Sequence, residues 1–233
     1  MDGIAFQAPS MLNYWLKNGV NINTVNWLPC FPEPPIEGIL RKDYEPSSGV
    51  IRLAYFGRLA GNKGLQLLLR ALAAPIVPSK VMLYIWGIGT EEGKLKELTA
   101  ELGLLDRVKF LGAYPGSEEG ADLMASYDAL VLCSTGAEGL PLILLEAMAY
   151  GLPFLSTNVG AIKDCCENNP DTILVQPTLE DITIGLSTLV HRIETGDFDA
   201  QRLRLFYENH FSYQVMALRW RTCFQNPINF FVD

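Results

Sequence analysis

Apolar runs and helix-like stretches alternate along most of the chain. The apolar runs predict strands over residues 50–56, 81–86, 108–111, 129–133, 153–156 and 172–175. Stretches with apolar positions at helical spacing predict helices over 64–74, 91–102, 120–127, 141–150, 179–194, 200–209 and 213–224. Strands that alternate with helices in this way form β-α-β units, whose strands run parallel. The pattern therefore predicts an α/β fold with a mostly parallel sheet that helices cover on both faces.

A proline-rich segment separates this region from a short N-terminal one. Four prolines fall within residues 29–35, and such a run continues neither a helix nor a central strand. Before it lie an apolar run at 4–6, a helix-like piece at 9–17 and a second run at 24–28, which are too little for a domain. We therefore expect an incomplete N-terminal piece over 1–25, a crossover linker over 26–40, one domain over 41–212, and a C-terminal helix and tail over 213–233.

The composition fits a globular protein and excludes several classes of partner. The 233 residues are 49% hydrophobic, which is enough for a substantial core. No apolar run reaches the length of about 18 residues that a membrane-spanning helix needs, so we expect no transmembrane segment. The formal net charge is −8, whereas a nucleic-acid groove needs clustered positive charge, so we expect no nucleic-acid partner. An anionic ligand would have to be held by a few placed cations and by backbone N–H groups.

Cysteines and histidines offer no metal site and no catalytic triad. The five cysteines form no Cys-x-x-Cys pair, and their odd number gives no disulfide framework. The two histidines, His191 and His210, fall in charged, helix-like stretches. The sequence start also lacks the basic segment of a secretory signal. A reducing, cytoplasmic location and a site without metal are the simplest expectations.

In α/β folds ligands bind beyond the carboxyl ends of the strands, so the segments that follow the strands hold the candidate chemistry. After the first strand, Gly57, Arg58, Lys63 and Gly64 place two cations among glycines just before a helix. Glycines let a ligand approach the backbone, and the two cations are suited to flank a diphosphate. The alternative is a solvated turn with a capping glycine. The string matches neither the dinucleotide fingerprint nor the Walker loop.

The segment after the fourth strand carries two carboxylates and a helix start. Pro141 suits the first turn of a helix, so Gly139 and Leu140 would present backbone N–H groups at its N-terminus, where an anion is favoured. Glu138 lies just ahead of this helix. Glu146 lies inside it among apolar residues, where a carboxylate needs a hydrogen-bond donor such as a ribose diol. The alternatives are that Glu138 caps the helix and that Glu146 faces water or an arginine.

Glycine-rich turns follow two further strands. The turn at Gly87 and the turn over 111–114 can each bring backbone atoms to a base. Each can equally be an ordinary connection between a strand and a helix.

Together these motifs resemble the nucleotide-sugar-binding half of a retaining glycosyltransferase with the GT-B fold, glycosyltransferase family four. The resemblance covers roughly residues 26–224 and rests above all on Glu138 and Glu146, which match the Glu-x7-Glu motif of that family. It implies a three-layer, Rossmann-like domain that forms the C-terminal half of a GT-B fold. The implied donor is a nucleotide-diphosphate sugar, with a UDP-sugar favoured over a GDP- or ADP-sugar, and no separate cofactor or metal.

The resemblance also implies roles for individual positions. Arg58 and Lys63 would bind the donor diphosphate and stabilise the charge on the leaving nucleotide diphosphate, and Glu138 would orient the donor sugar. These three are the expected catalytic residues, and Glu146 would hold the ribose hydroxyls. The remaining donor contacts are expected from Gly57, Gly87, Leu111, Ala113, Tyr114, Gly139, Leu140, Pro141 and Leu142.

The chain departs from the family pattern at its N-terminal side. Residues 2–17 resemble only the last strand and helix of the acceptor-binding domain. The crossover reads Pro-Cys-Phe-Pro at 29–32 in place of Pro-Asn-Gly, and the loop that often reads Gly-Gly-x-x-Glu reads Gly-Ala-Ile-Lys-Asp at 160–164. We therefore expect this chain to bind the donor and to transfer the sugar poorly without the missing acceptor domain, which would also make any peripheral membrane contact.

Three other functions compete with a glycosyltransferase. The first is a non-catalytic module that binds a nucleotide sugar, and the second is a nucleotide-sugar epimerase of similar architecture, although no set of epimerase acids and bases is identifiable. The third, a dinucleotide-dependent oxidoreductase, is disfavoured because the Gly-x-Gly-x-x-Gly fingerprint is missing after the first strand.

Overall fold

The computed structural model describes residues 4–19, 25–28, 37–41, 49–115, 117–136 and 138–225. The expected strands and helices of these ranges are present, with ends that shift by a few residues. The four prolines of the expected linker and Cys30, which lies between the first two, are outside the described residues. The four described cysteines are free thiols.

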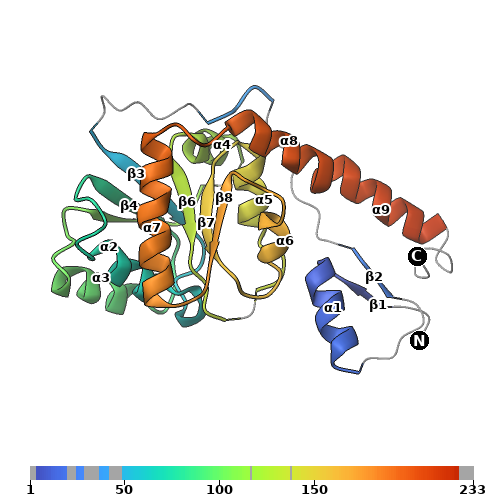
Figure 1. The fold of residues 1–233 in the computed structure, drawn as a ribbon, viewed down its shortest axis with the longest axis horizontal. Helices are drawn as coiled ribbons and strands as arrows, with labels where there is room; N and C mark the ends of the chain where they lie inside the picture. The colour runs from blue at the N-terminus through green and yellow to red at the C-terminus, as the bar shows by residue number, and fades with distance from the viewer. Residues whose placement is uncertain are drawn as a thin grey trace.

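Six parallel strands form the sheet of the main domain, in the order β5-β4-β3-β6-β7-β8 (Figure 1). They are β3 (Ile51–Phe56), β4 (Val81–Trp86), β5 (Val108–Gly112), β6 (Ala129–Leu132), β7 (Phe154–Thr157) and β8 (Thr172–Val175). The central strand β6 is buried at every position, as a strand covered on both faces requires. The strand order reverses between β3 and β6, and such a reversal opens a crevice at the carboxyl ends of the strands.

Helices cover both faces of this sheet, so the domain has three layers. The helices of the main domain are α2 (Leu65–Leu72), α3 (Glu92–Glu101), α4 (Ser117–Ala125), α5 (Leu142–Ala149), α6 (Lys163–Cys166), α7 (Leu179–Glu194) and α8 (Ala200–His210), and α9 (Tyr213–Gln225) follows α8. On one face α7 packs against α2, and on the other α8 packs against α5. The expected α/β fold with a Rossmann-like parallel sheet is confirmed. Among the α-helices of the described ranges, the pattern missed only α6, because four residues are too few to show a helical period.

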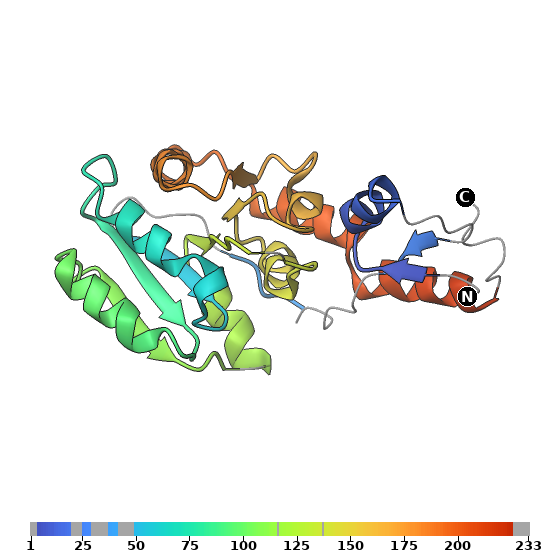
Figure 2. The same cartoon turned by 90° about the horizontal axis from the view of Figure 1, so that it is seen from below.

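A smaller unit precedes the main domain. It consists of β1 (Ile4–Phe6), α1 (Pro9–Lys17) and β2 (Val25–Trp27), and its two strands pair in parallel. Helix α9 leaves the main domain and runs alongside this pair of strands in both views (Figures 1 and 2). We call β1, α1 and β2 the N-terminal unit.

A buried carboxylate fixes the start of α8 against the sheet. Asp171, just before β8, has no exposed surface and accepts hydrogen bonds from Arg202 Nε at 2.7 Å and Arg202 Nη2 at 2.6 Å. It also accepts the backbone N–H of Asp199 at 2.8 Å, and Asp199 in turn caps the helix. Charged groups are tolerated in such buried places when they are paired and hydrogen-bonded.

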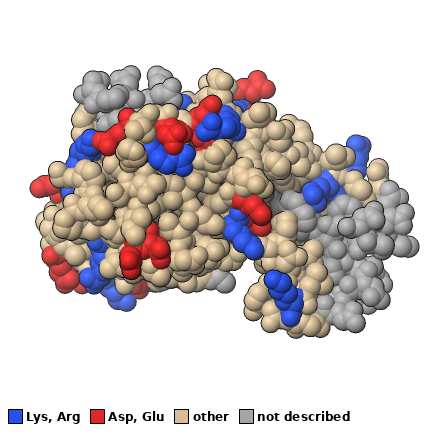
Figure 3. Space-filling view, viewed as in Figure 1, with Lys and Arg blue, Asp and Glu red and all other residues tan. Residues whose placement is uncertain are grey.

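The charges on the surface are mixed. On the face shown in Figure 3, the positive and negative side chains lie close to one another over the main domain. In the described part of the chain, no helix is both long enough and apolar enough to cross a bilayer.

Glycine is required where the loops after β3 and β6 meet. Gly64 adopts a left-handed backbone with φ of 67°, and a side chain there would collide with the carbonyl oxygen of Cys133, the residue that follows β6. Gly103 has a similar φ of 69° with no atom within 4 Å of the added Cβ position. Alanine at Gly103 would introduce backbone strain alone, whereas alanine at Gly64 would introduce the same strain and a steric clash. Comparing the two variants separates the two contributions to stability.

We expect Gly64→Ala to lower the free energy of unfolding by about 2–4 kcal/mol, because it combines left-handed strain with a backbone clash. Gly103→Ala should cost only about 1 kcal/mol, because it adds strain alone. Urea unfolding followed by circular dichroism measures both values. Equal losses in the two variants would show that the loops after β3 and β6 are not in close contact.

Candidate functional site

The loops after β3, β4 and β5 continue the backbone contacts of the sheet beyond its strands. Gly57 N–H donates to the Trp86 carbonyl at 3.0 Å, and Gly87 N–H donates to the Gly112 carbonyl at 2.6 Å. A side chain at Gly87 would collide with the Gly57 carbonyl, so these turns pack backbone against backbone. They form a continuous floor at the carboxyl edge of the sheet.

A cavity of about 310 Å³ lies on this floor. Its lining joins the ends of β3, β4 and β5 with one side of α5, and comprises Phe56, Gly57, Arg58, Trp86, Gly87, Ile88, Ala113, Tyr114, Ile143 and Glu146. Six of these ten were expected from the sequence as donor contacts: Gly57, Arg58, Gly87, Ala113, Tyr114 and Glu146. We call this space the edge cavity.

Four residues of the edge cavity were missed by the sequence analysis, namely Phe56, Trp86, Ile88 and Ile143. Phe56 and Trp86 are partners in the register of β3 and β4, and both are the last residues of their strands. The available signal was therefore that two neighbouring strands each end in an aromatic residue.

Aromatic contacts hold the wall of the edge cavity in place. The rings of Phe56 and Tyr114 meet edge to face, with centroids 4.7 Å apart. The indole Nε1 of Trp86 donates to the Tyr127 hydroxyl at 2.7 Å, and this hydrogen bond fixes the orientation of the indole ring. Such contacts leave an apolar surface that is preformed rather than mobile, which suits the flat face of a ring-shaped ligand.

Glu146 reaches the edge cavity from a helix that is otherwise apolar. It is half-buried, whereas its neighbours Leu145 and Ala147 are fully buried. Burial, and after it the nearby carboxylate of Glu146, raises the pKa of the Tyr114 hydroxyl well above its usual value. Glu146 and Tyr114 both line the cavity and lie within electrostatic reach of each other.

A second group of charges lies where the loops after β3 and β6 meet. Lys63 Nζ contacts Glu138 Oε1 at 2.5 Å, and the side chains are 15% and 12% exposed. Ser134 Oγ donates to the same carboxylate oxygen at 2.6 Å. The family resemblance implied that Lys63 and Glu138 both contact one nucleotide-sugar ligand. In the structure these two side chains form an ion pair.

The backbone of Glu138 is fixed by the loop after β7. Its carbonyl accepts the N–H of Ala161 at 3.1 Å, and a side chain at Gly160 would collide with its backbone. The alternative that Glu138 caps α5 is wrong, because the N-cap is Pro141, no side chain caps the helix, and the Glu138 carboxylate contacts Lys63 and Ser134. Glu138 is held by contacts from three loops, an arrangement that positions a carboxylate for a ligand.

Helix α5 begins one residue later than the sequence predicted. The helix begins at Leu142, and Pro141 is its N-cap with φ of −72° and ψ of 114°, so the expectation that Pro141 lies in the first turn is wrong. The Pro141 carbonyl instead accepts the N–H of Leu144 at 3.0 Å. Leu140 is buried, which leaves only its backbone for a ligand, while Gly139 and Leu142 are at least partly exposed.

Leu111 does not line the edge cavity. It lies within β5 with 40% of its surface exposed, one residue before the turn that carries Ala113 and Tyr114. The expected contact at Leu111 therefore has no support from the geometry.

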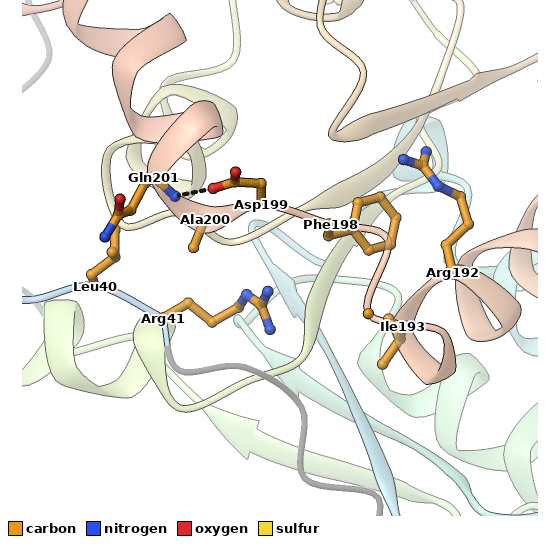
Figure 4. A pocket seen from close by; sticks show the side chains of 9 residues that line it. Leu40, Arg41, Arg192, Ile193, Phe198, Asp199, Ala200 and Gln201 are labelled. Atoms are coloured by element: carbon orange, nitrogen blue, oxygen red, sulfur yellow. Dashed lines mark hydrogen bonds between the residues drawn. The ribbon is translucent and has the colours of Figure 1, made fainter.

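A cavity of about 520 Å³ lies away from this edge, where Leu40 and Arg41 meet the end of α7 and the start of α8 (Figure 4). The charged groups that line it are used in structural contacts. Arg41 Nε donates to the Gly151 carbonyl at 3.2 Å, Arg192 stacks on Phe198 and pairs with Asp197, and Asp199 caps α8. Although it is larger, this cavity is a junction between elements, and the edge cavity is the better candidate site.

Metal ligands are not grouped in the described residues. No three histidine, cysteine, aspartate or glutamate side chains among them lie close enough together to hold a metal ion.

Comparison with known proteins gives a family. Residues 51–192 match the family described as glycosyl transferases group 1. The chain is 26% identical over 180 residues to a subunit of the phosphatidylinositol N-acetylglucosaminyltransferase of Arabidopsis thaliana, covering 75% of this chain and 38% of that protein. It is 32% identical over 129 residues to N-acetyl-alpha-D-glucosaminyl L-malate synthase of Bacillus anthracis, covering 55% of this chain and 33% of that protein. The matched part of the chain thus spans between 33% and 38% of the length of these two curated relatives.

Solved structures share the fold at low sequence identity. Sucrose-phosphate synthase from Thermosynechococcus elongatus superposes with a TM-score of 0.81 at 19% identity, covering 98% of this chain and 59% of that one. Anabaena HepE in complex with UDP and glucose superposes with a TM-score of 0.78 at 19% identity, covering 96% of this chain and 63% of that one. The likeness extends over both the main domain and the N-terminal unit.

We expect Tyr114→Phe to weaken the dependence of stability on alkaline pH. The raised pKa means that the folded state holds the Tyr114 proton more tightly than the unfolded chain does, so this group makes unfolding easier as the pH rises above about 10. The variant should lose stability less steeply than the wild type between about pH 9.5 and 11, with their difference at about pH 7 as the baseline. Urea unfolding at fixed pH values measures this, and parallel curves would contradict the partly buried position of the Tyr114 hydroxyl.

Proposed function

Because the chain belongs to the glycosyl transferases group 1 family, we propose that its main domain binds a nucleotide-diphosphate sugar as the donor half of a retaining glycosyltransferase, glycosyltransferase family four. The fold supports this, since the parallel sheet matches the GT-B glycosyltransferase neighbours. One observation carries the proposal: a single cavity at the carboxyl edge of the sheet joins Arg58, Tyr114 and Glu146.

The edge cavity fits a nucleoside. Its aromatic and aliphatic walls would receive the flat base beside Tyr114, and Glu146 would accept hydrogen bonds from the ribose hydroxyls. Similar solved structures hold UDP, which makes a UDP-sugar the first donor to test. A carboxylate on an apolar helix needs hydrogen-bond donors, and the two hydroxyls of a ribose would supply them to Glu146.

The diphosphate would lie between the edge cavity and the Lys63–Glu138 pair. Arg58 lines the cavity and follows the same strand as Lys63, and its guanidinium can bind a phosphate through two N–H groups. Lys63 would supply a point charge, and the first turn of α5 would add backbone N–H groups that have no acceptor within the helix. The sugar would then lie beside Glu138 and Gly139.

Transfer would be assisted by electrostatics without a metal. Negative charge develops on the leaving nucleotide diphosphate as the bond to the sugar breaks, and Arg58 and Lys63 would be placed to stabilise it. Glu138, held by Lys63 and Ser134, would orient the sugar. The acceptor hydroxyl would approach from the face that the diphosphate leaves, so the configuration of the sugar carbon would be retained.

The first test is calorimetric titration with UDP, GDP and ADP. We expect at least one to bind, and Arg58→Ala, Lys63→Ala and Glu146→Ala each to weaken it by roughly tenfold to a hundredfold, the value of a charge-assisted hydrogen bond. Lys80→Ala is the matched control, because Lys80 pairs with Glu194 at the opposite, amino end of β4. No binding of any of the three by folded protein would rule out the donor site.

The second test concerns metal and stereochemistry. With the best-binding nucleotide sugar, slow release of the sugar to water should persist in excess EDTA and should yield first the anomer that the donor carries, as NMR can record. Release that stops in EDTA, or that yields the opposite anomer, would contradict the proposed mechanism. Binding without any release would instead favour a nucleotide-sugar-binding module.

A further inference from the structure

The N-terminal unit reaches the donor edge of the main domain through one side chain. Gln7 lies in the turn between β1 and α1, at the carboxyl end of β1. A side chain at Gly139 would collide with Oε1 of Gln7, so the carboxamide lies directly against the backbone that follows Glu138. Two parallel sheets thus place their carboxyl ends on either side of the same loop.

Contacts at the start of α1 fix this approach. Ser10 donates twice to Asp164 Oδ2 in α6, from its backbone N–H at 3.2 Å and from its hydroxyl at 2.5 Å. The carboxylate therefore caps the first turn of α1 from the main domain, and α1 lies beside α6. Ala8, between Gln7 and Ser10, has no exposed surface. The backbone on both sides of Ala8 is held, while Gln7 itself stays exposed.

The chemistry of the carboxamide suits a sugar. Glu138 is an acceptor, and its Oε1 already contacts Lys63 and Ser134. A carboxamide offers both donors and an acceptor, which match the hydroxyl groups of a sugar, and it carries no charge that would repel a diphosphate. Because it lies against Gly139, the residue after Glu138, Gln7 can add polar groups from the N-terminal unit to the surroundings of a sugar bound there.

We propose that Gln7 contacts the donor sugar, and that Ser10 positions it through Asp164. This inference rests on the proposed function, because it takes the sugar to lie beside Glu138 and Gly139. It adds a specificity residue from the N-terminal unit to a donor site otherwise built by the main domain.

The test compares a nucleotide with the same nucleotide carrying a sugar, by calorimetry on the full chain: UDP against UDP-glucose and UDP-N-acetylglucosamine, GDP against GDP-mannose, and ADP against ADP-glucose. For the base that binds, Gln7→Ala and Gln7→Met should weaken the nucleotide sugar by about three- to tenfold, the value of a neutral hydrogen bond or two. They should change the affinity for the nucleotide itself by less than about twofold. Asn13→Ala, which removes an exposed carboxamide from α1, is the control and should change neither.

Ser10→Ala separates positioning from simple stability. It should weaken the nucleotide sugar in the wild-type background and have little further effect in Gln7→Ala, because its influence passes through Gln7. Additive losses would overturn the positioning role.

The outcomes distinguish this inference from the proposed function. If nucleotide and nucleotide sugar both bind and Gln7→Ala changes neither, or changes both equally, Gln7 does not contact the sugar and the donor site still stands. If the wild type binds neither compound, the proposed function fails and the inference fails with it.

Discussion

The candidate site depends on one close approach, between the loops that follow β3 and β6. These strands are neighbours at the point where the strand order reverses. The loops that follow them therefore both lie beyond the carboxyl ends of the two central strands. Gly64 lets one loop lie against the Cys133 carbonyl of the other, and Thr135 N–H donates to the Asn62 carbonyl at 2.8 Å. Only with the backbones this close can Lys63 reach Glu138.

The candidate site carries two cations, Arg58 and Lys63, although the chain as a whole has a net negative charge. The chain has a net charge of −8, so a diphosphate would meet general repulsion unless cations were placed where it binds. Arg58 and Lys63 follow β3, one of the two central strands, and the ion pair with Glu138 restrains the Lys63 ammonium. A lysine fixed in this way has less conformational entropy to lose when an anion binds beside it.

The N-terminal unit also contributes to this edge, through the turn that follows β1. Its described contacts with the main domain include those of Ser10 with Asp164, of Gln7 with Gly139, and of α1 with α6. A site between two such bodies depends on a few polar contacts, so small changes at Asp164 would be felt at Gly139. This is the usual arrangement of ligand sites at the boundary between domains.

The sequence determined the local features: the alternation of strands and helices, the residues that follow each strand, and the Glu138–Glu146 spacing on one segment. These depend on contacts between residues near in sequence, which leave a period or a motif, although the start of α5 was placed one residue early. Only the tertiary structure decided that Phe56 and Trp86 share a wall, that Lys63 pairs with Glu138 across 75 residues, and that Gln7 meets Gly139. Such pairings follow from strand order and from the docking of separate units, and a contact between distant residues leaves no periodic signal in the sequence of either.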